Sequence, residues 1–307
     1  MKSAITIAWL SVAGGVFACS GVSFAQERRN SIDFRANADM VLVPVTVVDR
    51  RGEILSGLQR YNFTLLEDRV EQPIVSFTGE DLPCSVGLIL DLSASMRDAL
   101  GAAKGAARAF LETSNPDDDF FLLTVSDSPQ VVSGFTAEVG SLESHIQVSE
   151  AAGNTALIDT IYMGLDHMRA SRKARRALLV VSDGMDNHSR YSQAELMRLA
   201  VEADVQIYTV AIDRIPRYKK AVEVLEERRG LAMLQDLSER TGGLHFTVMN
   251  LAEINDAAVK LSRAIRNQYV IGYQPQSNQR YGKWRRIHVK VNLPNANVYA
   301  RNGYYSH

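Results

Sequence analysis

Asp91, Ser93 and Ser95 place one carboxylate and two hydroxyl groups at alternating positions of a short segment. The apolar run 86–90 comes directly before them, and such a run predicts a buried parallel strand. Open α/β sheets hold their ligands at the carboxyl ends of their strands. Hard oxygen donors favour Mg²⁺, Mn²⁺ or Ca²⁺ over zinc or copper. The segment therefore indicates a divalent-cation site, although Ser95 by itself could be only the N-cap of a helix.

Two later segments offer further oxygen donors. Thr155 follows Gly153 on a loop that opens a predicted helix, and Asp183 lies between the strand-like run 178–182 and a turn glycine. The carboxyl ends of parallel strands meet at one edge of a sheet, so the three segments are expected to lie together. Asp159 is one helical turn after Thr155. It either accepts a hydrogen bond that holds the metal loop or makes an ordinary surface contact.

The D-x-S-x-S segment, the later threonine and the aspartate within S-D-G resemble the metal-ion-dependent adhesion site of von Willebrand factor type A domains. The resemblance covers residues 84–267. It implies that the hydroxyl groups bind the metal directly, whereas at least one aspartate often acts through water. The metal residues that it implies are Asp91, Ser93, Ser95, Thr155 and Asp183. Residues on the neighbouring strand-end loops that could set ligand specificity are Ser126, Asp127, Asp186, Asn187 and His188.

The segments on either side resemble a narrower group, a bacterial family described as VWFA-related and abundant in acidobacteria. The amino-terminal match runs from Val41 to Phe63, and the carboxyl-terminal match runs from Gln268 to Tyr304. This resemblance concerns architecture, because the group has no agreed activity.

Alternating strands and helices predict a doubly wound, mostly parallel α/β sheet over residues 84–267. Predicted helices span 96–113, 139–149, 156–170, 192–203, 231–240 and 251–267, with a further short helix expected within the charged stretch 214–230. Residues 40–82 and 268–307 show β character without a helical period. We expect these two parts to pair into one β-sandwich around the inserted domain, because about 40 residues bury little surface alone. Two independent β appendages are the alternative.

Residues 1–25 have the features of a secretory signal peptide, with a cleavage site at 23–25. A lipoprotein signal ending at Cys19 is the alternative, and either route exports the protein to the periplasm or the cell exterior. Residues 26–39 are polar and are expected to form a flexible lead-in. After cleavage only Cys84 remains, so no intrachain disulfide can form and a buried thiol is expected.

Composition excludes several function classes. The formal net charge of −1 argues against a general polyanion binder, and no apolar run after the leader reaches the roughly 20 residues of a membrane-spanning helix. The basic run 169–176 ends a predicted helix, so a solvated helix end is preferred to a nucleic-acid patch. The histidines show no zinc-like spacing. Aromatic residues crowd 269–305, where sheet packing accounts for them better than a carbohydrate platform.

Three function classes remain. Three of the five predicted donors are neutral hydroxyls, and at least one of the two carboxylates often acts through water in such sites. A divalent cation held in this way would stay electrophilic and accept a further carboxylate from an Asp or Glu of a protein partner. A non-enzymatic, metal-dependent protein-binding or adhesion module is therefore the leading hypothesis. A structural envelope protein with a purely stabilising metal is an alternative. A metal-assisted phosphoryl-transfer enzyme with Asp91 as nucleophile is disfavoured, because Ser93 stands where D-x-D phosphatases carry a second acidic residue.

Overall fold

The computed structural model describes residues 40–213, 221–275 and 282–306. The expected signal peptide, the lead-in and Cys19 lie outside these residues, as does the segment 214–220 of the charged stretch. Among the described residues, no helix is both long enough and apolar enough to cross a membrane.

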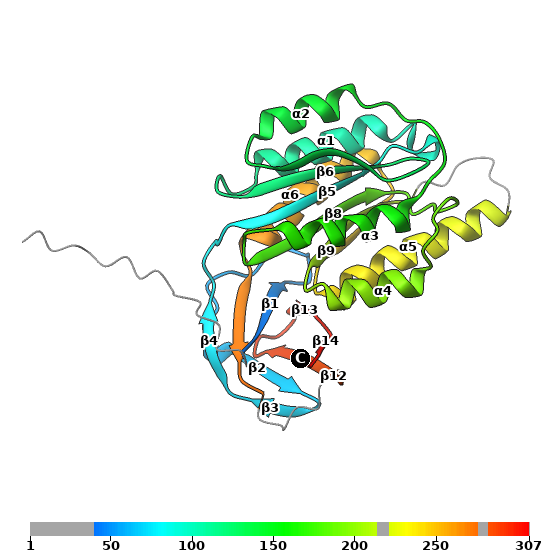
Figure 1. Ribbon diagram of the computed structural model, residues 1–307. Helices are drawn as coiled ribbons and strands as arrows, with labels where there is room; N and C mark the ends of the chain where they lie inside the picture. The colour runs from blue at the N-terminus through cyan, green and yellow to red at the C-terminus, as the bar shows by residue number, and fades with distance from the viewer. Residues whose placement is uncertain (1–39, 214–220, 276–281, 307) are drawn as a thin grey trace, which may run out of the picture. The chain divides into compact units, whose positions relative to one another are not determined.

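A six-stranded sheet forms the centre of the α/β domain, and all of its strands except the edge strand β7 run parallel (Figure 1). The strands, in spatial order, are β10 (His245–Val248), β9 (Gln206–Ile212), β8 (Arg175–Ser182), β5 (Cys84–Asp91), β6 (Asp119–Val125) and β7 (Gln130–Thr136). Every residue of β5 is buried. A strand that is covered on both faces has to be apolar throughout, which is why the run 86–90 lacks alternation.

Helices cover both faces of this sheet (Figure 1). Apolar residues of α1 (Leu100–Glu112), α2 (Val139–Val148) and α6 (Ile254–Arg266) belong to the core on one face, and those of α3 (Leu157–His167), α4 (Gln193–Glu202) and α5 (Ala221–Thr241) belong to the core on the other. Short 3₁₀ helices span Arg60–Asn62, Ala94–Met96, Met168–Ala170 and Leu251–Glu253. The predicted doubly wound α/β fold is confirmed.

The β segments before and after the α/β domain form two four-stranded sheets. The first sheet contains β13 (Asn297–Ala300), β1 (Val41–Val48), β11 (Tyr269–Tyr273) and β4 (Ile74–Thr78), and the second contains β14 (Gly303–Tyr305), β12 (Trp284–Val291), β2 (Phe63–Glu67) and β3 (Val70–Gln72). Antiparallel pairing joins β1 to β11 and β13, and joins β2 to β12. Each sheet therefore combines strands from both ends, as predicted for an inserted α/β domain.

One apolar cluster lies between these two sheets. Val43, Val45 and Val47 of β1 belong to it, and so do Leu65 of β2 and Ile287 of β12. Alternate residues of a strand point to opposite faces of its sheet. The alternating apolar residues of these strands are therefore what allows each sheet to bury one face against the other.

Two helices differ from the sequence prediction in extent. The helix expected from residue 96 begins at Leu100, because the 3₁₀ turn Ala94–Met96 comes first and buries Met96. Helix α5 begins at Ala221 and takes in charged residues that were expected to form a separate short helix. Glu and Arg have high helix propensity, so a helix can start in a segment that lacks an apolar stripe. The three-residue strands β3 and β14 were not predicted, because they are too short to show a period.

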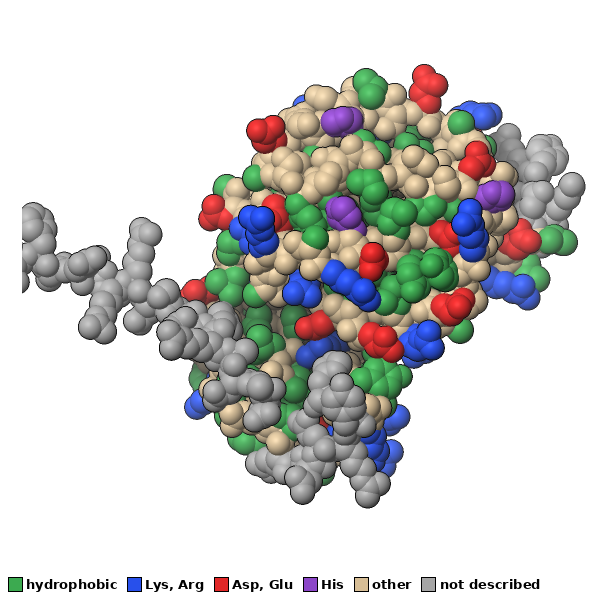
Figure 2. Space-filling model, in the orientation of Figure 1, with side chains coloured by type: hydrophobic (Ala, Val, Ile, Leu, Met, Phe, Trp, Pro, Cys, Tyr) green, Lys and Arg blue, Asp and Glu red, His purple; other side chains and the backbone are tan. Residues whose placement is uncertain are grey.

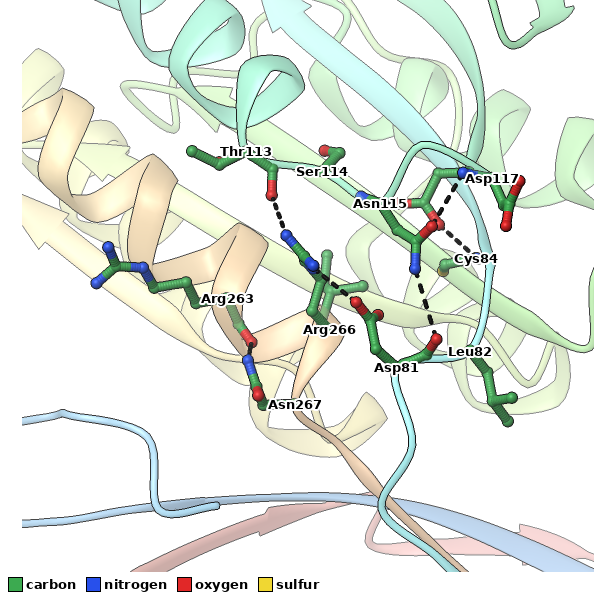
Figure 3. A network of polar contacts seen from close by, with 12 residues as sticks. Asp81, Leu82, Cys84, Thr113, Ser114, Asn115, Asp117, Arg263, Arg266 and Asn267 are labelled. Atoms are coloured by element: carbon green, nitrogen blue, oxygen red, sulfur yellow. Dashed lines mark hydrogen bonds and ion pairs between the residues drawn. The ribbon is translucent and has the colours of Figure 1, made fainter. Parts of the chain in front are cut away.

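Polar contacts fix the end of α6 against the connection that leads into β5 (Figure 3). Arg266 donates to the carboxylate of Asp81 at 2.8 Å and to the carbonyl of Thr113 at 3.1 Å. The side-chain amide of Asn115 donates to the carbonyl of Asp81 at 3.5 Å. The connection around Asp81 is therefore held by hydrogen bonds to the α/β domain.

Arg175 lies in the same region and is buried. It donates to the carbonyl of Leu82 at 2.6 Å and to the side chain of Gln268 at 2.9 Å. The interpretation of 169–176 as a solvated helix end was therefore wrong for this residue, because its guanidinium has exchanged water for protein acceptors. Cys84 is a buried free thiol, as expected, and burial raises its pKa to about 12.

Candidate metal centre

Asp91 is the last residue of β5, and its side chain is completely buried. One carboxylate oxygen accepts a hydrogen bond from the N–H of Ser93 at 2.9 Å, and the other accepts from the hydroxyl of Ser182 at 2.6 Å. The hydroxyls of Ser93 and Ser95 lie 3.0 Å apart. The carboxylate is therefore held both by its own loop and by the adjacent strand β8.

Asp183 directly follows β8 and is also buried. Because β5 and β8 pair in parallel, Asp91 and Asp183 lie at the same edge of the sheet. Burial, followed by the nearby Asp183 carboxylate, raises the pKa of Asp91 to about 7, although hydrogen bonds from Ser182 and Ser93 oppose the shift. A bound cation would relieve both the desolvation and the repulsion.

Thr155 lies on the loop before α3 and is 2% exposed. Backbone hydrogen bonds tie its loop to the loops that follow β5 and β8. The N–H of Ala94 donates to the carbonyl of Gly153 at 3.1 Å, and the N–H groups of Asn187 and His188 both donate to the carbonyl of Thr155 at 3.0 Å. The three predicted loops therefore lie together at the carboxyl edge of the sheet.

Asp127 supports the Thr155 loop from the neighbouring strand β6. Its carboxylate accepts hydrogen bonds from the N–H and the side-chain amide of Asn154, both at 2.8 Å, and the backbone hydrogen bond holds its pKa below the usual value. Gly153 has a φ of +80°, and a Cβ at this position would lie 2.8 Å from an Asp127 oxygen. The loop therefore requires glycine for both its conformation and its space.

Asp186 and Asn187 were predicted to set ligand specificity, but their side chains accept hydrogen bonds from the protein itself. Asp186 accepts from the N–H of Leu157 at 2.9 Å and from the hydroxyl of Ser189 at 2.6 Å, and burial raises its pKa. The side-chain oxygen of Asn187 accepts from the N–H of Thr155 at 3.0 Å. These two residues position the start of α3 and the threonine loop.

Asp159 accepts hydrogen bonds from the N–H groups of Arg190 at 2.9 Å and Tyr191 at 3.0 Å. Both contacts are with backbone N–H groups of the segment that follows His188, so the expected hydrogen bond to the metal loop stays a prediction. The loop that it holds is the one that follows His188, since its partners are Arg190 and Tyr191 rather than the hydroxyls of the metal set.

Asp127 and His188 are exposed and line a groove of about 770 Å³ that borders α3 and the start of α4. The rings of Tyr162 and Tyr191 stack beside each other in this groove, with their centroids 3.9 Å apart. Ser126 is turned toward its own loop, where its hydroxyl donates to the carbonyl of Ser128 at 3.2 Å. Of the predicted specificity set, Asp127 and His188 therefore border a groove next to the centre, whereas the exposed Asn187 does not line it.

Ser182 and Gly230 also support the centre, although the sequence reading did not select them. Besides binding Asp91, the Ser182 hydroxyl accepts a hydrogen bond from the N–H of Gly184 at 3.0 Å. Gly230 of α5 packs on Gly184, and a Cβ on Gly230 would lie 1.6 Å from the Gly184 carbonyl oxygen. The sequence does give one signal for Gly230, because it is a glycine among strong helix formers. A glycine inside a helix is unfavourable unless close packing requires it.

The donor set fits a hard cation. Among residues 40–213, 221–275 and 282–306, no three His, Cys, Asp or Glu side chains are grouped to hold a metal ion. The candidate centre has two carboxylates, and the other side chains of the predicted set are hydroxyls. Carboxylate and hydroxyl oxygens suit Mg²⁺, Mn²⁺ or Ca²⁺ and do not suit a zinc site.

Residues 86–185 match the family model for the von Willebrand factor type A domain. This part of the chain is a von Willebrand factor type A (VWA) domain. The matched segment contains Asp91, Ser93, Ser95, Thr155 and Asp183. The narrower resemblance of the flanks to a bacterial VWFA-related family stays a prediction.

Solved structures with similarity to the chain include a von Willebrand factor type A protein from Catenulispora acidiphila. It is 10% identical, with a TM-score of 0.52 over 87% of this chain and 73% of that chain. At this identity the likeness shows the fold alone. The VWA domain of a type V pilus tip protein from Porphyromonas gingivalis is 13% identical, with a TM-score of 0.48 over 60% of this chain and 95% of that chain.

An aerotolerance-related membrane protein from Bacteroides fragilis is 16% identical, with a TM-score of 0.47 over 59% of this chain and 98% of that chain. An uncharacterized protein of Borreliella burgdorferi is 22% identical over an alignment of 180 residues, and the match covers 52% of this chain and 52% of that protein. The chain therefore spans about half the length of this curated relative.

Proposed function

We propose that this protein is a non-enzymatic binding module whose VWA domain takes up a divalent cation and binds a carboxylate of a protein partner. The residues that would hold Mg²⁺, or Mn²⁺ or Ca²⁺, are Asp91, Ser93, Ser95, Thr155 and Asp183. The bound cation would supply an open position for one more oxygen ligand, such as an Asp or Glu of the partner. The proposal rests chiefly on the pair of buried carboxylates at the edge where the three loops are tied together.

The contacts of Asp91 favour binding over phosphoryl transfer. Both of its carboxylate oxygens accept hydrogen bonds, from Ser93 and Ser182. A nucleophile has to be reached by a phosphoryl group, which is much larger than a cation, whereas this carboxylate is completely buried, and Ser93 stands where D-x-D phosphatases carry a second acidic residue. The exposed side chains of Asp127 and His188 border the groove beside the centre, where a partner's surface would contact the protein.

Titration with Mg²⁺ tests the cation site. Asp183→Ala should lose more than about 100-fold in affinity, because it removes a charged ligand from the proposed set. Asp117→Ala is the matched control, since Asp117 is exposed and lies at the opposite, amino-terminal end of β6. Calorimetry on the three proteins measures the affinities. Equal affinity in all of them would contradict the assignment.

A partner captured from a cell-envelope extract in Mg²⁺ should be released by a chelator and should not bind Asp183→Ala. Changing the partner's contacting Asp to Asn, or Glu to Gln, should abolish the interaction. If the chelator only lowers the melting temperature and a carboxylate is not needed, the metal is purely stabilising.

The proposal includes export, and the intact mass of native protein should correspond to a chain that begins at Gln26. A lipidated chain that begins at Cys19 would instead indicate membrane anchoring.

A further inference from the structure

A groove of about 620 Å³ lies on the outer face of the second four-stranded sheet. The candidate metal centre lies elsewhere, at the carboxyl ends of the strands of the six-stranded sheet. In Figure 2, Lys and Arg side chains are visible at the lower right of the molecule, where Figure 1 shows β12. The groove residues that can contact a ligand are Arg69, Arg240, Trp284, Arg286, His288 and Lys290. No acidic residue lines the groove among the residues that the structure describes.

Strand β12 presents basic side chains in a row. Arg286, His288 and Lys290 are exposed on one face, while Ile287 and Val289 are buried on the other. Residues two apart on a strand are separated by roughly 6.6 Å. The row therefore offers regularly spaced donors that suit a linear chain with repeated anionic groups.

Three of these basic side chains lack an acidic partner in the described part of the protein. In the described part of the chain, Arg69, Arg286 and Lys290 form no ion pair, whereas Arg240 is paired with Asp236 at 2.7 Å. Like charges close together on one face of a sheet are destabilising. Folding alone therefore gives no reason for this concentration of cations, and an anionic ligand would remove the repulsion.

Arg69 sits in a strained turn at the edge of the groove. Asp68 and Arg69 connect β2 to β3, with φ values of 49° and 73°. A two-residue hairpin turn with both φ values positive favours Asn-Gly, and a long side chain at the second position is unfavourable. Strain of this kind points to a role for the side chain itself. The role that the position allows is to add a cation to the groove.

Trp284 supplies an apolar surface next to the cations. Its ring packs over Gly303 of β14, where an added Cβ would lie 2.5 Å from a ring atom, and it meets the ring of Tyr305 edge-on with centroids 5.1 Å apart. The ring is only half-buried. An aromatic face can pack on the C–H surface of a sugar ring.

We propose that this groove binds a linear anionic polysaccharide, independently of the metal centre. Small anions would neutralise only one or two of the cations, whereas a polymer can match the whole row. Single-stranded nucleic acid is disfavoured, because its binding sites use a series of aromatic side chains on which successive bases stack. Here Trp284 is the only Phe, Tyr or Trp side chain that lines the groove among the described residues.

Heparin is a suitable probe, measured by calorimetry and by the fluorescence of Trp284 at fixed ionic strength. The full chain should bind heparin equally well in Mg²⁺ and in chelator, and Asp183→Ala should bind it like the unchanged chain. The double variant Arg286→Glu/Lys290→Glu should lose at least about tenfold in affinity per cation. The matched control Arg169→Glu/Arg172→Glu has the same change in charge at a helix end and should bind normally.

Arg69→Gly provides a test that is independent of folding defects. Glycine relaxes the positive φ, so the variant should be at least as stable as the unchanged chain, yet it should bind heparin about tenfold more weakly. Equal loss in the Arg169/Arg172 control would indicate nonspecific attraction and overturn the proposal. Tighter binding of single-stranded DNA than of heparin, or undiminished heparin binding by Arg69→Gly and the groove double variant, would also overturn it. Failure of Mg²⁺ binding would contradict only the proposed metal function.

Discussion

The Ser182 hydroxyl donates to Asp91 at 2.6 Å and accepts from the N–H of Gly184. It therefore holds the Asp91 carboxylate against the turn that contains Asp183. Ser182→Ala should weaken Mg²⁺ binding by about tenfold, because groups that orient a ligand typically contribute this much to metal affinity. Calorimetry with Mg²⁺ measures the change. The effect should be smaller than that of Asp183→Ala, which removes a ligand itself.

Ser85→Ala is the control for this substitution. Ser85 is also a fully buried serine on the same sheet, but its hydroxyl has no hydrogen-bond partner within the described structure. Its loss should leave Mg²⁺ affinity unchanged and should not lower stability, since an unpaired buried hydroxyl only adds a desolvation cost to the folded state. Equal effects of the two serine variants on affinity would show that the Ser182 contact has no special role.

At this scale the sequence predicted the oxygen donors but not the groups that support them. Asp91 and Asp183 could be selected because each follows an apolar strand. The supporting roles of Asp186 and Asn187 could not be predicted, because their side-chain oxygens accept hydrogen bonds from N–H groups about 30 residues earlier in the chain. The sequence does not distinguish a polar loop residue that faces solvent from one that contacts a neighbouring loop.

At the scale of elements, the closest approach near the centre is between α5 and the loop after β8. Gly230→Ala should destabilise the protein by about 1–3 kcal/mol and weaken Mg²⁺ binding, because the added methyl has to displace the Gly184 carbonyl. Urea unfolding measures the first effect and calorimetry the second.

Gly101→Ala is the matched helix control. A Cβ at Gly101 in α1 would meet no atom within 4 Å. This variant should gain up to about 1 kcal/mol, since alanine is the better helix former. If Gly230→Ala also stabilised the protein, close packing of α5 on the loop would not constrain the centre.

On the scale of the whole molecule, β1 and β2 depend on strands from the far end of the chain. Deleting residues 269–307 removes β11, β12, β13 and β14 and should expose Val43, Val45, Val47 and Phe63. Each buried side chain of this size contributes roughly 1.5–3 kcal/mol when it leaves water. The truncated chain should therefore become protease-sensitive in residues 40–80 while its VWA domain still binds Mg²⁺.

Limited proteolysis of the full and truncated chains, read by mass spectrometry, measures this dependence. Cleavage at the same rate within residues 40–80 in both chains would mean that the amino-terminal strands are stable alone. Loss of Mg²⁺ binding in the truncated chain would instead mean that the sandwich supports the centre. Contacts such as Arg301 with Asp204 and the N–H of Asn302 with Arg240 give a route for such support.

The sequence by itself determined the type of most elements and the order of the candidate ligands along the chain. Local spacing of apolar residues records which face of a strand or helix is buried, and strand-end polar residues mark one edge of the sheet. Only the tertiary structure decided which strands pair and that Arg175 is buried. It also decided that Gly230 contacts Gly184 and that Arg69 and Lys290 line the same groove. These features depend on which surfaces meet between residues far apart in the chain, and no local pattern carries that information.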